Sequence, residues 1–182
     1  LDPLGEPRGR RPWSLTPEDY GTFLCSLFDE WYRDWAAGRY TSVRLFDDYV
    51  HLAMGLPAGT CATSGSCGAY AGVEGDGSVY PCDFFALDEW KLGNIHQTPL
   101  AALSAGRREQ EFLQEGLDHP APCAACRWQA LCQGGCKRDW TTGAQGGRQN
   151  YYCAAFQKFF AHAEPRLRQI AAAEQRARRM GL

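Results

Sequence analysis

The spacing of eight cysteines constrains this chain more than any other feature of its sequence. In order, the thiols form C-x5-C-x14-C, then C-x2-C-x5-C-x3-C, then one more cysteine: Cys61, Cys67, Cys82, Cys123, Cys126, Cys132, Cys136 and Cys153. Eight thiols make two sets of four, and four thiolates are what an iron–sulfur cluster or a structural zinc ion takes. The ninth cysteine, Cys25, lies in a stretch of helical apolar periodicity and is interpreted as a small buried hydrophobe.

Spacing alone leaves the identity of the metal open. The C-x2-C pair places Cys123 and Cys126 on one tight turn, where both thiols can reach the same metal. Gly134 and Gly135 lie between the last two thiols of the run and let backbone N–H groups approach sulfur, which favours a sulfide cluster. Two zinc sites would satisfy the same count, and disulfides are a third alternative. Trp128 is interpreted as a shield for the bound group.

The start of the chain and its charge limit the compartment and the partners. The first residues, LDPLGEPRGRRPW, contain no apolar stretch of a secretory signal, and no run approaches the roughly eighteen apolar residues of a membrane span. We therefore expect a cytoplasmic protein, in which closely spaced cysteines favour metal over disulfides. The 182 residues carry a net charge of -2, so nucleic acid is not expected as a partner. Because no membrane span is visible, a membrane is not expected as a partner either. The absent initiator Met indicates a fragment.

Helical and strand signals together predict an α+β fold. Thr16 and Pro17 predict a helix start, and apolar residues recur at helical spacing from Tyr20 to Trp35, up to Gly38. Further helices are expected at 45–54, at 98–117 with Thr98 as cap, and at 150–180 with a break near Pro165. The turn signal Asp76–Gly77 predicts a hairpin of strands 70–73 and 78–80, with a third strand at 92–95. Residues 120–147 are expected to be irregular.

These residues together resemble a known family. The array Cys67-x9-Gly77-x4-Cys82, the C-x2-C-x5-C-x3-C run and the final Cys153 look like the SPASM domain, the twin-cluster extension of many radical S-adenosylmethionine enzymes. Within that group the sequence most resembles the anaerobic sulfatase-maturating enzymes. The features that carry this second resemblance are Cys61, the VYPCDFF stretch at 79–85, the LGNI stretch at 92–95 and the aromatic helix YGTFLCSLFDEWYRDW at 20–35.

The resemblance implies a domain plan and a set of ligands. Residues 1–58 would be the last part of a (β/α)6 radical S-adenosylmethionine barrel with a linker helix, 59–164 the SPASM domain, and 165–182 a helical tail. Two auxiliary 4Fe–4S clusters are implied. One would take Cys61, Cys67, Cys82 and Cys136, and the other would take Cys123, Cys126, Cys132 and Cys153. Ligands would thus cross between the two parts of the array, as in two-cluster ferredoxins.

The resemblance also implies a role for Asp83, which directly follows Cys82. Its carboxylate would take the proton from a substrate thiol or hydroxyl, while a 5′-deoxyadenosyl radical removes a hydrogen atom from the substrate Cβ. The alternative is an Asp that accepts backbone N–H bonds at the turn after the strand. The implied substrate is a sulfatase polypeptide, in which Cys or Ser becomes Cα-formylglycine, and the implied electron donor is a ferredoxin or flavodoxin.

One expected motif is missing from the sequence. The radical-generating pattern C-x3-C-x2-C does not occur among the nine cysteines. S-adenosylmethionine and a third 4Fe–4S cluster would therefore belong to the intact enzyme, an oxidoreductase, and we expect this chain alone to be inactive. Two alternatives stay open: the SPASM domain of another peptide-modifying radical enzyme, or a stand-alone module that binds a peptide on a metal scaffold.

Overall fold

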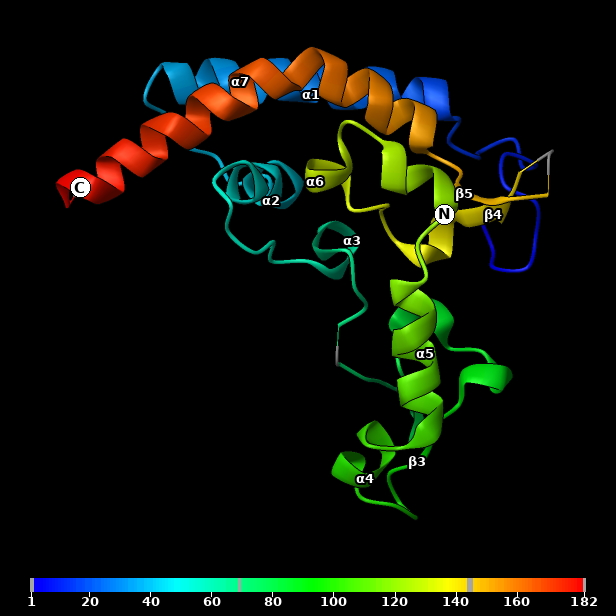
Figure 1. The fold of residues 1–182 in the computed structure, drawn as a ribbon. Helices are drawn as coiled ribbons and strands as arrows, with labels where there is room; N and C mark the ends of the chain where they lie inside the picture. Colours follow the sequence, from blue (N-terminus) through cyan, green and yellow to red (C-terminus); the bar gives the residue numbers. More distant parts are fainter. Residues whose placement is uncertain (1, 69, 144–145, 182) are drawn as a thin grey trace. The chain divides into compact units, whose positions relative to one another are not determined.

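The chain folds into two compact units of mixed helices and small sheets (Figure 1). A computed structural model describes residues 2–68, 70–143 and 146–181. The first unit combines Leu1–Ser64 with Pro120–Leu182, and the second consists of Gly65–His119. This mixture confirms the expected α+β class, whereas the expected domain limits at residues 58 and 164 stay predictions.

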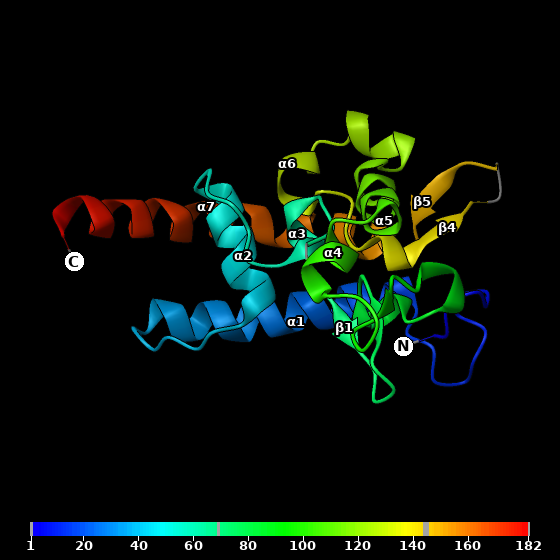
Figure 2. The ribbon, with the colours of Figure 1, turned by 90° about the horizontal axis from the view of Figure 1, so that it is seen from below.

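In the first unit, α1 (Pro17–Ala36), α2 (Arg44–Ala53) and α7 (Cys153–Met180) enclose an aromatic core. The shorter helices α3 (Cys61–Ser64) and α6 (Gln129–Cys132) belong to the same unit. α1 and α7 lie side by side, and α2 packs across them (Figure 2). Phe28, Phe46 and Phe159 come from these three helices and are fully buried, with ring centroids 5.3 to 5.6 Å apart. Such aromatic pairs add to the hydrophobic gain of burial.

The start of α1 follows the sequence signals. The Thr16 hydroxyl accepts the Asp19 N–H at 3.1 Å, and Pro17 occupies the first turn. Further along, Gly21 lets α1 approach α7 closely, because a Cβ at this position would lie 3.2 Å from the Cα of Ala155. The expected helix at 45–54 is also confirmed, as α2.

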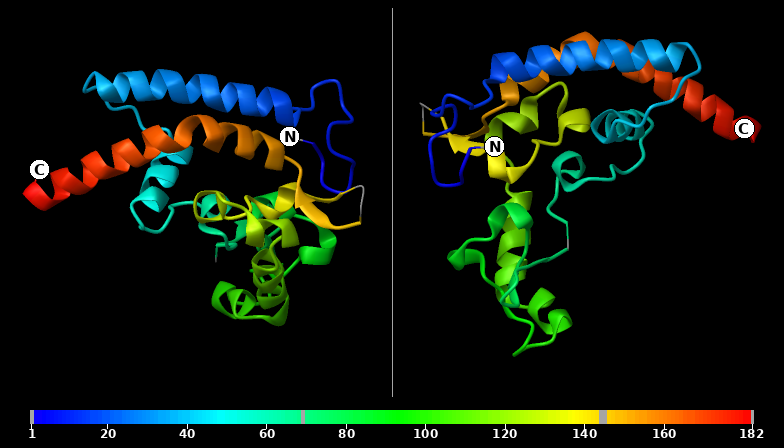
Figure 3. Two further views of the ribbon diagram at one scale, coloured as in Figure 1. Left: turned by 45° about the horizontal axis from the view of Figure 1, so that its top comes forward. Right: turned by 180° about the vertical axis from the view of Figure 1, so that it is seen from behind.

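The last helix differs from the expectation in two ways. α7 begins at Cys153 rather than at Asn150, and it continues through Pro165 without a break (Figure 3). Pro165 removes one backbone hydrogen bond, which ordinarily costs about 3 kcal/mol in a helix interior. Fully buried residues lie on both sides of it, Phe160 before and Leu167 after. Their burial against the core outweighs the proline, so the prediction of a break was wrong.

The segment 120–147 is more regular than expected. Besides α6 it contains β4 (Trp140–Thr142), which pairs antiparallel with β5 (Arg148–Asn150), and Trp140 lies opposite Asn150. Residues 144 and 145, near the end of this segment, lie outside the described residues. The strands were missed because their residues are mostly polar and lack the alternating apolar pattern of a half-buried strand.

The second unit holds the predicted hairpin. β1 (Gly72–Val73), β2 (Ser78–Tyr80) and β3 (Gly93–Asn94) form an antiparallel sheet in the order β1-β2-β3, which confirms all three expected strands. The single helix expected at 98–117 is instead two helices, α4 (Leu100–Ser104) and α5 (Arg107–Leu117). Gly106 is the N-cap of α5, with extended backbone that interrupts the helix, and Thr98 caps neither helix.

In the part of the chain that the structure describes, no helix is both long and apolar enough to cross a membrane. The two longest helices, α1 and α7, instead bury one face each in the aromatic core of the first unit.

Candidate metal centre

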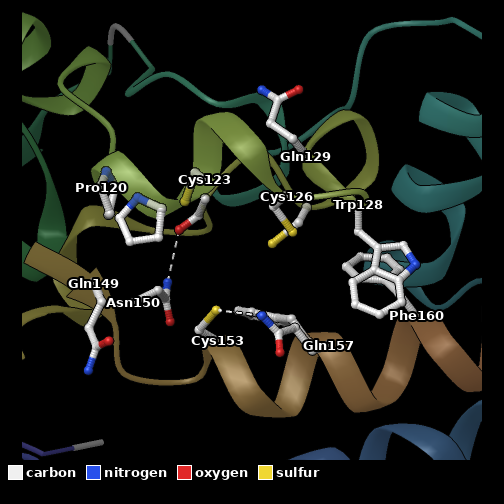
Figure 4. Close-up of a pocket in the computed structure, with 14 residues that line it drawn as sticks. Pro120, Cys123, Cys126, Trp128, Gln129, Gln149, Asn150, Cys153, Gln157 and Phe160 are labelled. Carbon is white, nitrogen blue, oxygen red and sulfur yellow. Dashed lines mark hydrogen bonds between the residues drawn. The ribbon is translucent and has the colours of Figure 1, made fainter.

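Four of the eight cysteines border one cavity in the first unit. Cys123 lies in a 3₁₀ turn (Ala121–Ala125), Cys126 directly follows that turn, Cys132 ends α6, and Cys153 begins α7. Figure 4 shows Cys123 and Cys126 on one side of the cavity and Cys153 facing them from the other. The structure therefore brings together the second predicted ligand set: Cys123, Cys126, Cys132 and Cys153.

The rest of the cavity is lined mainly by proline, aromatic and amide side chains. Trp128 and Phe160 close one side, with their rings stacked at 6.5 Å (Figure 4). Trp128 also donates its indole N–H to Glu164 at 3.2 Å, which fixes the ring at the cavity. The four thiols are free of disulfides. Within the described ranges, no three His, Cys, Asp or Glu side chains meet closely enough to hold one metal ion, and the thiols border a cavity instead.

Burial raises the pKa of three of the cavity thiols in the metal-free chain, those of Cys123, Cys132 and Cys153. It raises the pKa of Cys132 to about 12, and the neighbouring thiols add to this rise. The Gly134 N–H, which hydrogen-bonds to the Cys132 sulfur, acts in the opposite direction. Because only thiolates bind metal, a bound positive group would reverse these shifts and release protons.

A buried amide connects the two chain segments that carry the thiols. Asn150 is 6% exposed; its Nδ2 donates to the Gly134 carbonyl at 3.0 Å, and its Oδ1 accepts the Tyr152 N–H at 2.8 Å. The first bond holds the turn after Cys132, and the second lies directly before Cys153. Asn150 therefore fixes one thiol relative to another, a role that sequence reasoning missed because a single Asn in a polar stretch gives no signal.

Cys136 lies apart from this set. It borders a second cavity of the first unit, together with Ala62 and Thr63, which directly follow Cys61 in α3. Cys132 borders both cavities. The structure thus places Cys136 on the side of the Cys61 segment.

The second unit contains Cys67 and Cys82. A Cβ on Gly116 of α5 would lie 2.6 Å from the Cys67 sulfur, so any larger residue there would require a shift of this thiol or of the helix. Cys82 is buried, and burial raises the pKa of its thiol. The structure describes these two thiols in one unit and Cys61 and Cys136 in the other, so the first ligand set stays a prediction.

Asp83 is exposed next to Cys82, at the start of the 3₁₀ turn Asp83–Phe85. The Cys82 thiol lies 3.5 Å from its Oδ1. In the described part of the chain, no backbone N–H donates to the Asp83 carboxylate. The carboxylate is therefore accessible to a ligand, and the alternative interpretation as a turn-capping residue lacks its hydrogen bond.

Comparison with known proteins bears on this arrangement. Residues 66–127 match the SPASM family, described as an iron-sulfur cluster-binding domain. Cysteine-type anaerobic sulfatase-maturating enzymes of Clostridium novyi and Clostridium perfringens are each 40% identical, over 161 and 172 residues. Residues 66–127 thus match a SPASM domain, and most of the chain is similar to anaerobic sulfatase-maturating enzymes. The two alignments cover 88% and 94% of this chain but only 43% and 46% of the relatives.

The relationship extends to a second type and to the fold. A serine-type anaerobic sulfatase-maturating enzyme of Bacteroides thetaiotaomicron is 31% identical over 156 residues, which cover 84% of this chain and 37% of that enzyme. The solved structure of native anSMEcpe with bound AdoMet and Kp18Cys peptide superposes with a TM-score of 0.87 at 39% identity, and covers 95% of this chain and 48% of that one. The chain thus spans less than half the length of these relatives.

Proposed function

We propose that this chain is the auxiliary-cluster part of an anaerobic sulfatase-maturating enzyme, which oxidises a sulfatase Cys or Ser to Cα-formylglycine. The observation that carries the proposal is the set of four free thiols around one cavity, in a chain related to these enzymes along most of its length. In this proposal the segment before α2 is the last part of a radical S-adenosylmethionine barrel.

The donor set fits an iron–sulfur cluster better than zinc. Four sulfurs border the cavity, and a cluster of several irons and sulfides fills such a space, whereas a zinc ion needs all four sulfurs about 2.3 Å away. Cys123, Cys126, Cys132 and Cys153 would hold one 4Fe–4S cluster. Following the family resemblance, Cys61, Cys67, Cys82 and Cys136 would hold the second. The position of Cys136 beside the residues that follow Cys61 supports this grouping.

Asp83 would act on the substrate. Its exposed carboxylate can accept the proton of a substrate thiol or hydroxyl that docks beside Cys82. Oxidation to formylglycine also removes a hydrogen atom from the substrate Cβ, and S-adenosylmethionine bound elsewhere in the intact enzyme would supply the radical for that step. The peptide bound to anSMEcpe supports a polypeptide substrate. A ferredoxin or flavodoxin would supply the electron that cleaves S-adenosylmethionine. The auxiliary clusters held by the eight cysteines would supply an acceptor for the second electron that leaves the substrate.

Metal content tests the first half of the proposal. The chain purified without oxygen should be brown, absorb broadly near roughly 400 nm and carry about eight irons. A colourless chain with about two zinc ions would contradict the cluster assignment. Cys136→Ala tests the grouping: it should remove the cluster of Cys61, Cys67 and Cys82. Loss of the Cys123, Cys126, Cys132 and Cys153 cluster instead would refute it.

Activity tests the second half. An enzyme that joins this chain to a radical-generating barrel should convert a Cys- or Ser-containing sulfatase peptide to the aldehyde, detected by mass spectrometry after hydrazone formation. A peptide that stays unchanged, while S-adenosylmethionine is cleaved and another peptide is modified, would assign the chain to a different peptide-modifying enzyme.

A further inference from the structure

A buried carboxylate on α2 contacts the segment that carries Cys61. Asp48 is 3% exposed, and its helix neighbours Phe46 and Tyr49 are buried in the aromatic core of the first unit. The packing of α2 therefore fixes the position of Asp48 in the first unit. Nothing in the proposed chemistry uses this group.

The carboxylate holds the chain on both sides of Cys61. Asp48 Oδ1 accepts the Gly59 N–H at 2.7 Å, and Oδ2 accepts the hydroxyls of Thr60 at 2.7 Å and Thr63 at 2.6 Å. Gly59 and Thr60 precede Cys61, and Thr63 follows it. The approach is close, because a Cβ on Gly59 would lie 3.1 Å from Oδ1.

Hydrogen-bond donors balance the charge of Asp48, and the backbone N–H of Thr60 adds to the three just described. Within the described residues Asp48 forms no ion pair, so its three short hydrogen bonds are the charge-assisted kind and stronger than those between neutral groups. Burial raises the pKa of Asp48, but the hydrogen bonds from Thr63, Thr60 and Gly59 outweigh burial and bring the pKa below its ordinary value. The group is therefore ionised near neutral pH.

α3 cannot hold Cys61 without help. The helix spans only Cys61–Ser64, four residues, and an isolated helix this short is unstable because its first turn costs more than it gains. The direction of the Cys61 thiol must therefore depend on contacts outside α3, and the Asp48 hydrogen bonds are such contacts.

We propose that Asp48 is a positioning residue for Cys61, which it holds in place for metal binding by fixing Gly59, Thr60 and Thr63. The inference rests on the proposed role of Cys61 as a cluster ligand. Asp48 itself stays outside the ligand set, and its effect passes through the backbone of the 59–63 segment.

The test compares two neighbouring substitutions of equal charge. Asp48→Asn keeps the size of the side chain but replaces one acceptor oxygen by a donor. Asp47→Asn is the control, because Asp47 holds Ser42 and Tyr40 instead of the Cys61 segment. We expect Asp48→Asn to retain about four irons where the wild type and Asp47→Asn hold about eight, and to lose one of two reduced-cluster signals in electron paramagnetic resonance.

Three outcomes decide the inference from metal content. The inference is supported if Asp48→Asn loses one cluster but keeps the other, held by Cys123, Cys126, Cys132 and Cys153. The remaining cluster then shows that the first unit is folded, which circular dichroism checks independently. Unchanged iron, signals and midpoint potentials in Asp48→Asn would overturn the inference. Loss of all eight irons would also overturn it, because Asp48 would then support the whole unit rather than Cys61.

A second measurement does not need a cluster. In the metal-free chain, Asp48→Asn and the milder Thr63→Val should raise the alkylation rate of Cys61 about tenfold, the change expected from losing one charge-assisted hydrogen bond, without changing that of Cys126. Equal Cys61 rates in both variants and the wild type would overturn the inference. If the wild type binds no iron, the proposed function fails, and this alkylation measurement still decides the role of Asp48.

Discussion

Replacing Gly116 by alanine should weaken metal binding at Cys67 while changing the free energy of unfolding only slightly. The added Cβ would lie 2.6 Å from the Cys67 sulfur and 3.2 Å from its Cβ. An ordinary contact begins at 3.4 Å, so sulfur and helix must move apart by about 0.8 Å. Metal ligand distances tolerate only about 0.2 Å, so a displacement four times larger should weaken the proposed cluster of Cys67.

The effect on stability is smaller because two contributions oppose each other. Alanine in a helix interior is favoured over glycine by about 1 kcal/mol. Overpacking a close contact costs about 1 to 3 kcal/mol. The net change in the free energy of unfolding of the metal-free chain is therefore at most about 2 kcal/mol, and thermal unfolding is not the assay that decides.

Iron content decides instead. Gly116→Ala should lower the iron of the anaerobically reconstituted chain from about eight towards about four, and a chelator should remove iron from the affected cluster faster. Gln114→Ala is the control, because Gln114 is an exposed residue of the same helix. If Gly116→Ala keeps the iron content and chelation rate of the control, the close approach of Cys67 to α5 does not exist in the loaded protein.

Three further predictions concern the thiol cavity and Asp83. Gly135→Ala should weaken the cluster of Cys153, because its Cβ would lie 2.6 Å from Asn150 Nδ2, while Gly55→Ala, with a similar positive φ and open space, should leave iron content unchanged. Burial raises the pKa of Cys132 to about 12, so at pH 8 only about one Cys132 side chain in ten thousand is a thiolate in the metal-free chain. Cys132 should therefore be alkylated most slowly of the cavity thiols at pH 8, and its rate should rise about tenfold per pH unit up to that pKa. An alkylation rate that does not change with pH would refute the raised pKa. Asp83→Asn in the intact enzyme should keep all iron but reduce peptide oxidation at least about a hundredfold, as expected for loss of a general base, and unchanged turnover would leave Asp83 without a catalytic role.

The sequence predicted the elements whose structure depends on contacts between residues close together in the chain. Thr16 and Pro17 start α1 through contacts within one turn, and Asp76–Gly77 closes the hairpin of β1 and β2. In both cases the deciding contact spans few residues. The count of eight thiols likewise indicated metal binding, but the grouping of Cys123, Cys126, Cys132 and Cys153 was implied by the family resemblance and not by their spacing.

The sequence did not predict features that depend on contacts between residues far apart in the chain. A break near Pro165 was expected in the last helix, but α7 continues through it because Phe160 and Leu167 are buried in the core. Asp48 and Asn150 are ordinary polar residues whose roles depend on partners 11 to 16 residues away, Gly59 and Gly134 among them. No composition or periodicity marks such a residue before the chain is folded.

The turn between Cys132 and Cys136 shows how spacing and conformation act together. Thiols four residues apart would lie on one face of a continuous helix and could enter the same site. Here Gln133, Gly134 and Gly135 have φ values of 52°, 81° and 68°, so the helix ends after Cys132 and the chain turns in the left-handed region. Glycine adopts this conformation readily, whereas Gln133 does so at a cost of about 1 to 2 kcal/mol. The turn directs the Gly134 N–H to the Cys132 sulfur. It also places Cys136 at the cavity that Ala62 and Thr63 line. The two glycines therefore permit the separation of the last thiol from its three sequence neighbours, which the proposed exchange of ligands requires.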